Sequence, residues 1–111
     1  MVKGHRIESE VVVGDFLEMM RHYSRERINC TDHTFFRLSD KQRKIFKCEK
    51  IRDYLLNEIP HMVGIQYNKC YAVFYKYDNK RYIRLTLDVG LDTIDAVTFY
   101  VVDGYQIPQI K

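Results

Sequence analysis

Four residues of types that can cleave RNA without a metal are spread along the chain: His33, Arg37, Arg84 and Tyr100. Such a reaction needs a base for the ribose 2′-hydroxyl, cations for the charge on the phosphorane and an acid for the leaving oxygen. The sequence has no G-x-S-x-G, Gly-rich phosphate loop, H-E-x-x-H or dinucleotide fingerprint. Their absence removes many enzyme classes as first interpretations.

His33 and Arg37 are four residues apart. If the turn after Thr31 is helical, they share one face and can converge on a phosphate. H-x-x-x-R is common by chance, so a capping or packing role for His33 remains an alternative.

Arg84 stands between Ile83 and Leu85 in a strand-like segment, so its side chain should point away from the apolar face. A cross-strand ion pair with Asp88 or Asp95 is the alternative to a site role. Tyr100 is a possible phenolic proton donor. Tyrosine is also a good strand residue, so packing explains most of the nine tyrosines equally well.

The net charge of +3 is unevenly spread, because the segment 37–52 holds seven bases against two acids. A basic block of this kind is typical of a phosphate-bearing partner, although a solvated helix face has the same composition. The candidate nucleic-acid-binding residues are Arg43, Lys44, Lys47 and Lys50.

The three cysteines give little indication of function. Cys30, Cys48 and Cys70 contain no C-x-x-C unit, so we expect buried thiols and no disulfide framework. Cys30 and His33 have a zinc-like spacing, but no second pair completes four ligands. We therefore expect no metal and no cofactor.

The periodicity changes at Pro60. Before it, apolar residues at helical spacing predict helices at about 15–25 and from the Ser39-x-x-Gln42 capping box to Ile59, with a short edge strand at 11–13. After it, alternating runs predict four strands, at 61–67, 70–77, 81–89 and 94–102. Their short connections require antiparallel neighbours.

These elements predict an α+β fold with two or three N-terminal helices packed on one face of a four-stranded antiparallel meander. The helices should cover the side with Ile83, Leu85 and Leu87. The alternation then leaves Arg84, Thr98 and Tyr100 on an open polar face. In the last strand we expect Val97 to face the core and Ala96 the other side.

The length of 111 residues predicts one domain. The longest charge-free apolar stretch, 59–68, is too short for a membrane helix, and no signal peptide is recognisable, so we expect a cytoplasmic protein with no membrane partner.

The ordered motifs resemble the RelE/ParE toxin superfamily, and most closely its BrnT-like branch and uncharacterised relatives with an early H-x-x-x-R. The similar segments lie within residues 30–102, and they are Thr31-Asp32-His33-Thr34-Phe35-Phe36-Arg37-Leu38, Tyr54-Leu55-Leu56, Val63-Gly64-Ile65, Tyr71-Ala72-Val73-Phe74-Tyr75, Tyr82-Ile83-Arg84-Leu85 and Val97-Thr98-Phe99-Tyr100. Residues 1–29 form an N-terminal extension with one expected helix, and 103–111 form a tail.

The resemblance implies a toxin-like, metal-independent endoribonuclease acting on RNA and neutralised by a small antitoxin-like protein, with His33, Arg37, Arg84 and Tyr100 at the site. Its alternative is a non-catalytic member that binds nucleic acid or a protein. The chain departs from the pattern after its third C-terminal strand, where Asp88 and Gly90 replace a second basic residue. By the resemblance, this departure implies that the second cation of the site is missing.

Overall fold

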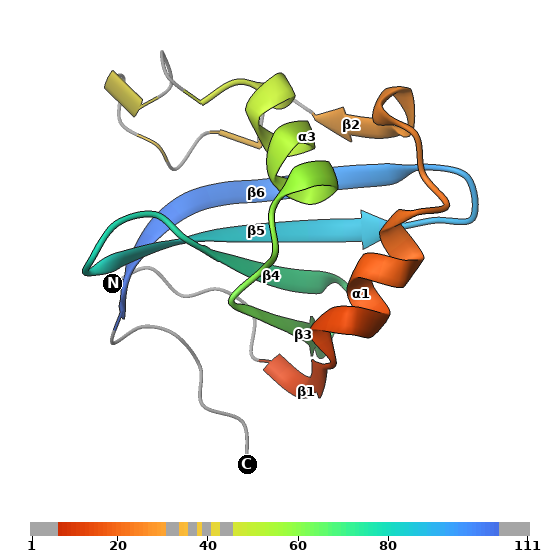
Figure 1. Cartoon of the computed structure of the whole chain (residues 1–111), viewed down its shortest axis with the longest axis horizontal. Coiled ribbons are helices and arrows are strands. Elements are labelled where there is room, and N and C mark those ends of the chain that lie inside the picture. The colour runs from red at the N-terminus through yellow and green to blue at the C-terminus, as the bar shows by residue number, and fades with distance from the viewer. Residues whose placement is uncertain (1–6, 31–33, 36–37, 39–40, 43–45, 105–111) are drawn as a thin grey trace.

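A single mixed sheet organises the chain (Figure 1). The computed structural model describes residues 7–30, 34–35, 38, 41–42 and 46–104. The elements, in chain order, are β1 (Ile7–Val11), α1 (Val13–Met20), the 3-10 turn η1 (Arg25–Arg27), β2 (Ile28–Cys30), α3 (Cys48–Asn57), β3 (Met62–Gln66), β4 (Tyr71–Lys76), β5 (Arg81–Val89) and β6 (Ile94–Asp103).

The sheet has six strands in the order β1-β3-β4-β5-β6-β2, and its last pair, β6 with β2, is parallel. The four strands expected after Pro60 are present as β3 to β6, and each pairs antiparallel with the next. The predicted architecture, a four-stranded antiparallel meander under two or three N-terminal helices, is nevertheless wrong. The described residues contain two α-helices, and two further strands flank the meander.

Both additional strands come from the first 30 residues. β1 ends at Val11, where an edge strand was expected to begin, and Val13 already belongs to α1. β2 has only three residues, too few for an alternation pattern to reveal it. It can lie parallel to β6 because α3 and three strands intervene in the chain, which is a long enough crossover.

The helices are shorter than expected. α1 ends at Met20 instead of about residue 25, and the phenol of Tyr23 then bonds to Gly90 O at 2.5 Å. The helix expected from Ser39 to Ile59 is interrupted: Lys41 and Gln42 are helical, but Phe46 and Lys47 are not, and α3 begins only at Cys48 because the preceding Lys47 has an extended backbone with φ −117° and ψ 170°. Ser39 itself lies outside the described residues.

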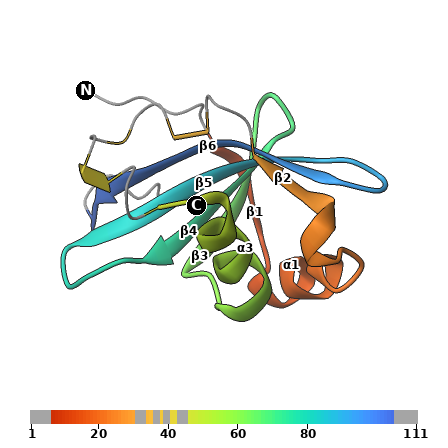
Figure 2. The same ribbon diagram turned by 90° about the horizontal axis from the view of Figure 1, so that it is seen from above.

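α1 and α3 pack against the same face of the sheet (Figure 2). Phe16 and Met20 of α1 and Ile51 and Leu55 of α3 are buried there. They meet the predicted apolar side, whose residues Ile83, Leu85, Leu87 and Phe99 are fully buried. Each helix therefore buries one apolar stripe on this face, and the area removed from water stabilises the packing.

A β-bulge changes the face of two residues in β6. The register with β5 shifts between Thr86 and Leu87, so that Leu87 faces Ala96 and Thr86 faces Thr98. Ala96 is therefore fully buried with the core, and Val97 is 39% exposed. The expectation for Ala96 and Val97 was the reverse and is wrong, because strict alternation fails where a strand contains one extra residue.

The second face of the sheet is buried at its centre, which contradicts the expected open polar face. Arg84 and Tyr100 are 6% and 3% exposed, and Thr98 is half-buried. Their neighbours Phe74 and Ala72 are completely buried. Alternation correctly placed Arg84 opposite the Ile83 and Leu85 face, but it carries no information on whether a polar face is covered.

Cys30 and Cys48 form a disulfide, with Cα atoms 5.9 Å apart, so the expectation that they are separate thiols is wrong. The bridge joins the end of β2 to the first residue of α3. Sequence spacing could not reveal it, because pairing requires that β2 lies beside α3 in space. Across the described ranges, no helix is long and apolar enough to cross a membrane.

Candidate functional site

Arg84 and Tyr100 lie directly opposite each other on β5 and β6. The register therefore brings together two of the four residues proposed for catalysis, on the second face. The Arg84 guanidinium donates from Nη2 to Gln66 Oε1 at 2.9 Å and lies over the Phe74 ring, 5.3 Å from its centroid. A guanidinium held in this way has a structural role whether or not it has a chemical one.

A turn holds the partner of Arg84 in place. Gln66 is 1% exposed, and its Nε2 donates to Asn68 Oδ1 at 3.1 Å, which also accepts the Cys70 N–H at 3.1 Å. The turn is completed by Lys69, whose φ of 75° is left-handed. The side-chain oxygen Oε1 of Gln66 is thereby oriented toward Arg84. These contacts fix the guanidinium over β3 and β4.

The proposed ion pair of Arg84 with Asp88 or Asp95 does not fit the sheet. Asp88 and Asp95 face each other in the register, four residues along β5 from Arg84. Four residues of strand span about 13 Å, which is beyond the reach of the Arg84 side chain. Both carboxylates are exposed, where water screens their repulsion.

His33 and Arg37 lie outside the described residues. Their chain neighbour Thr34 is fully buried against β6, where its Oγ1 donates to Ala96 O at 2.8 Å and its carbonyl accepts the Phe99 N–H at 2.9 Å. The chain at Thr34 is thus fixed one residue away, along β6, from Tyr100. Sequence reasoning missed Thr34 because its backbone contact with β6 depends on the unexpected strand β2.

Of the four candidate nucleic-acid-binding residues, Lys47 and Lys50 are described and both are exposed. Lys47 precedes α3, and Lys50 lies in its first turn with its ammonium 5.8 Å from the Tyr54 ring centroid. In the described part of the chain, neither lysine has an acidic partner within ion-pair distance. Arg43 and Lys44 are outside the described residues.

Two arginines near these lysines are already occupied. Arg52 donates from Nε and Nη2 to Ile28 O at 3.0 and 2.8 Å and contacts Glu49, which ties α3 to β2. Arg25 of η1 bonds Glu49 at 2.7 Å and also contacts Asp53. The pKa of Arg25 is raised, chiefly by its hydrogen bond with Asp53. The acidic side chains of α3 are therefore paired with arginines, and Lys47 and Lys50 remain available to bind a ligand.

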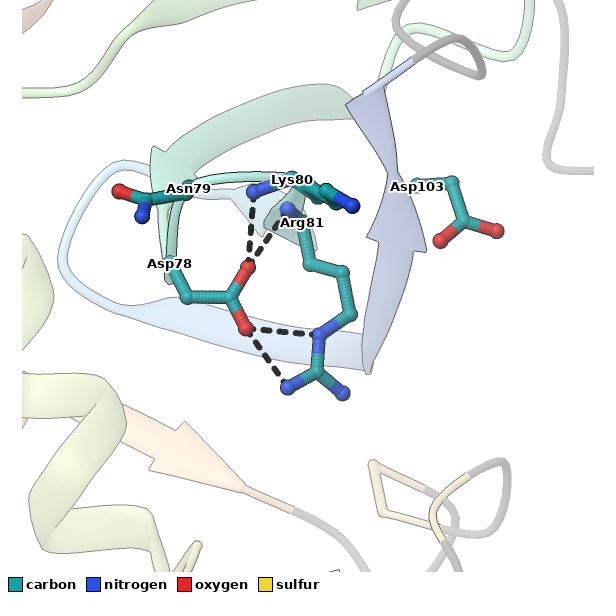
Figure 3. A pocket seen from close by; sticks show the side chains of 5 residues that line it. All are labelled: Asp78, Asn79, Lys80, Arg81 and Asp103. Carbon is teal, nitrogen blue, oxygen red and sulfur yellow. Dashed lines mark hydrogen bonds and ion pairs between the residues drawn. The ribbon is translucent and has the colours of Figure 1, made fainter.

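A shallow cavity of about 380 Å³ lies at the β4–β5 hairpin (Figure 3). Asp78 accepts the backbone N–H groups of Lys80 and Arg81 at 3.0 and 2.8 Å and the Arg81 Nε at 2.8 Å. These bonds, the side-chain bond to Arg81 first, lower the pKa of Asp78. All of them close the hairpin, so we assign this cavity to the turn and not to catalysis.

The described residues contain no group of three or more His, Cys, Asp or Glu side chains that could hold a metal ion. Cys70 is a free thiol, and burial raises its pKa, which keeps it in the less nucleophilic protonated form. Neither feature points to metal-assisted or thiol chemistry at the positions described.

Comparisons of the chain with protein-family models, curated proteins and solved structures gave no match. They therefore leave the resemblance to the RelE/ParE superfamily untested.

Proposed function

We propose that the protein is a non-catalytic RNA-binding module of RelE/ParE type whose contact surface is the start of α3. The observation that carries this proposal is the exposure of Lys47 and Lys50 beside acids that are already paired with Arg25 and Arg52. Lysines that are not paired with a nearby carboxylate can bind the phosphates of a nucleic acid. The counterions that the nucleic acid then releases favour binding. The choice of RNA as the ligand comes from the resemblance.

The state of Arg84 supports binding over cleavage. A catalytic arginine must direct its donors at the scissile phosphate. Arg84 instead directs one donor to Gln66, packs on Phe74 and is 6% exposed. Exposed cations at α3 and a buried, oriented arginine on the second face fit a protein that holds RNA without cutting it.

Salt-dependent binding tests the proposal. The affinity for a fluorescent single-stranded RNA, measured by anisotropy at several salt concentrations, should fall linearly in log K against log salt. Each phosphate contact contributes roughly −0.7 to this slope, so the double variant Lys47→Gln, Lys50→Gln should flatten it by about 1.4.

A matched control comes from two lysines that are not part of α3. Lys76 and Lys80 are also exposed, but they lie at the β4–β5 hairpin. The variant Lys76→Gln, Lys80→Gln removes the same charge and should leave the slope nearly unchanged. Equal flattening in both double variants would mean that only net charge matters, and the proposed contact surface would be wrong.

A second candidate function is the toxin-like, metal-independent endoribonuclease. One observation favours it: Arg84 and Tyr100 are register partners, and Thr34, the residue after His33 in the sequence, bonds β6 at Ala96 and at Phe99, which is next to Tyr100. Under this proposal His33 or Tyr100 transfers protons, and Arg37 and Arg84 stabilise the phosphorane. A small antitoxin-like protein would neutralise the activity.

Incubation with labelled RNA in EDTA separates the two functions. Discrete cleavage that is lost in Tyr100→Phe and His33→Ala would establish the endoribonuclease and refute the non-catalytic module. Intact RNA, together with saturable binding, supports the module. Expression in a test host adds a second readout, because a toxin arrests growth and a binding module of this kind does not.

The cellular compartment is a separate proposal. We place the protein in the cytoplasm, where RNA is present, although disulfides are rare in that compartment and Cys30–Cys48 is bridged here. Rapid alkylation of thiols in freshly lysed native cells decides the point. If Cys30 and Cys48 are recovered as free thiols, the cytoplasmic placement stands, and if they are recovered as a disulfide, an oxidising compartment replaces it.

A further inference from the structure

A second cavity, of about 460 Å³, lies where the end of α1 and the following turn meet the β5–β6 connection. These two segments are on the same side of the molecule in Figure 1, opposite the β4–β5 hairpin. The cavity is lined by Arg21, His22, Ser24 and Arg27 on one side and by Asp92 on the other. Three nitrogen-bearing side chains and a hydroxyl therefore surround one open space.

The walls of this cavity are held together by two bonds. Tyr23 donates its phenol to Gly90 O at 2.5 Å, and Arg27 Nη1 donates to Asp92 O at 3.4 Å. The connection is itself closed by the Gly90 N–H to Thr93 O bond at 2.8 Å. The site therefore exists before any ligand enters, which lowers the entropic cost of binding.

The donors of the cavity are only lightly used. Arg21 pairs with Glu18 at 3.4 Å, but both side chains are largely exposed, so this pair is weak. Arg27 engages one Nη, through a long bond, and a guanidinium has five N–H donors. His22 is exposed and donates from a ring nitrogen in either tautomer. These donors together match an anion with several acceptor oxygens.

We infer that this cavity binds a phosphate group, with Arg21 and Arg27 as the charged clamp and His22 as an additional donor. The Ser24 hydroxyl is already bonded to the Glu26 carboxylate. As the phosphate of an RNA strand it would be a second contact of the proposed RNA-binding function, and to that extent the inference rests on it. Free phosphate offers the same oxygens. Asp92 opposes an anion, because its carbonyl contacts Arg27 and its carboxylate adds negative charge to the rim.

Because Asp92 opposes an anion, the test includes one substitution that should strengthen binding and two that should weaken it. Inorganic phosphate and adenosine monophosphate are titrated into the whole protein at constant ionic strength, and binding is followed by the NMR signals of the His22 ring and the arginine Nε–H groups. Arg21→Gln and Arg27→Gln should each weaken binding by about 5-fold or more, and Asp92→Asn should strengthen it by about 3-fold, as expected for one charge near the surface.

Arg81→Gln is the control, because Arg81 is another exposed arginine and lies at the distant β4–β5 hairpin. It should leave phosphate binding unchanged. Thermal unfolding of each variant shows whether the fold is intact, since Arg27 also contacts Asp92 O. Equal weakening by Arg81→Gln, or weaker binding in Asp92→Asn, overturns the inference.

RNA binding by the same variants separates this inference from the proposed function. Loss of phosphate binding at Arg21 and Arg27 with RNA affinity unchanged means that the cavity serves free phosphate only. Phosphate binding with no RNA binding at all leaves the cavity assigned and refutes the RNA-binding module. No chemical-shift change with either phosphate ligand refutes the cavity site, whatever the lysines of α3 do.

Discussion

The two faces of the sheet bury side chains of opposite character. On the helix-covered face, apolar residues such as Leu85 and Phe99 pack against α1 and α3. On the second face, Arg84, Gln66 and Thr86 are almost as deeply buried, although they are polar. The first face is stabilised by the area removed from water, and the second requires that each buried polar group finds a partner.

Each face has one buried side-chain atom that makes no hydrogen bond among the described residues: Arg84 Nε on the second face and the Tyr75 phenol oxygen on the helix-covered face. Arg84 and Gln66 are bonded to each other on the polar face. On the apolar face, Tyr75 is 1% exposed and its phenol has no hydrogen-bond partner within the described residues. Arg84 still bonds Gln66 through its Nη2, whereas the phenol oxygen is the one polar atom of the Tyr75 side chain, so substitutions should affect the two faces for different reasons.

The largest effect should come from the centre of the helix-covered face. Phe99 is fully buried, and its ring centroid lies 5.0 Å from that of Phe46 and 5.9 Å from that of Phe35. Phe99→Ala should lower the free energy of unfolding by about 4 kcal/mol, because it leaves a cavity in this aromatic cluster. Urea unfolding measures it, and Leu91→Ala, at a 99% exposed residue, is the neutral control.

A somewhat smaller loss should follow from opening the link between the sheet and its helical cover. Reduction of Cys30–Cys48, or Cys30→Ser with Cys48→Ser, should cost about 3 kcal/mol, since the closed loop restricts the unfolded chain. Thermal unfolding with and without a reductant measures the loss. Cys70→Ser should leave the reductant effect intact, and an unchanged Tm on reduction would show that core packing and the bonds of Arg25 and Arg52 hold α3 without the bridge.

On the second face, Arg84→Ala should cost about 2 kcal/mol, because it leaves the buried Gln66 carbonyl without its charged donor and exposes the Phe74 ring. A double-mutant cycle with Gln66→Ala isolates the bond. Coupling near zero would mean that Arg84 is held by other contacts. A stability loss as large as that of Phe99→Ala would remove the distinction between the two faces.

Much of this contrast was readable from the sequence, and the unreadable part has physical causes. The alternation of apolar and polar residues predicted the strands β3 to β6 and the face of the sheet on which Arg84 lies, because both depend on local periodicity. It failed at Ala96 and Val97, where a bulge breaks the period, and at β2, which three residues cannot specify. The burial of Arg84 and the bond to Gln66 depend on how distant strands lie, and no pattern in one strand records that.

The candidate site also has a part that the sequence predicted and a part that it did not. Strand alternation and the resemblance together proposed Arg84 and Tyr100, and their register across β5 and β6 brings them together. The exposed cations of α3 were also expected, but the pairing of Arg25 and Arg52 with Glu49 was not. It arises because η1, β2 and α3 meet in space, and it determines which cations remain for a ligand.

The smallest expected effect concerns the buried phenol of the helix-covered face. Tyr75 lies 5.0 Å from the Tyr54 ring centroid and loses its hydration in the core without a bond that replaces it among the described residues. Tyr75→Phe keeps the ring and removes only this oxygen. It should therefore raise the free energy of unfolding by about 1 kcal/mol, because a buried hydroxyl without a partner costs about that much.

The pH dependence gives the same substitution a second readout. Burial raises the pKa of Tyr75 well above its ordinary value, so the folded state keeps the phenol protonated at a pH where the unfolded chain ionises it. The stabilisation from the neutral form is present below about pH 10 and is lost as the pH rises further, since the unfolded state then binds fewer protons. Unfolding measured from pH 7 to 11 should show a shallower alkaline decline in Tyr75→Phe than in the parent. A loss of stability in Tyr75→Phe at pH 7 would mean that the phenol has a partner, and that it contributes to the helix-covered face as a bonded group.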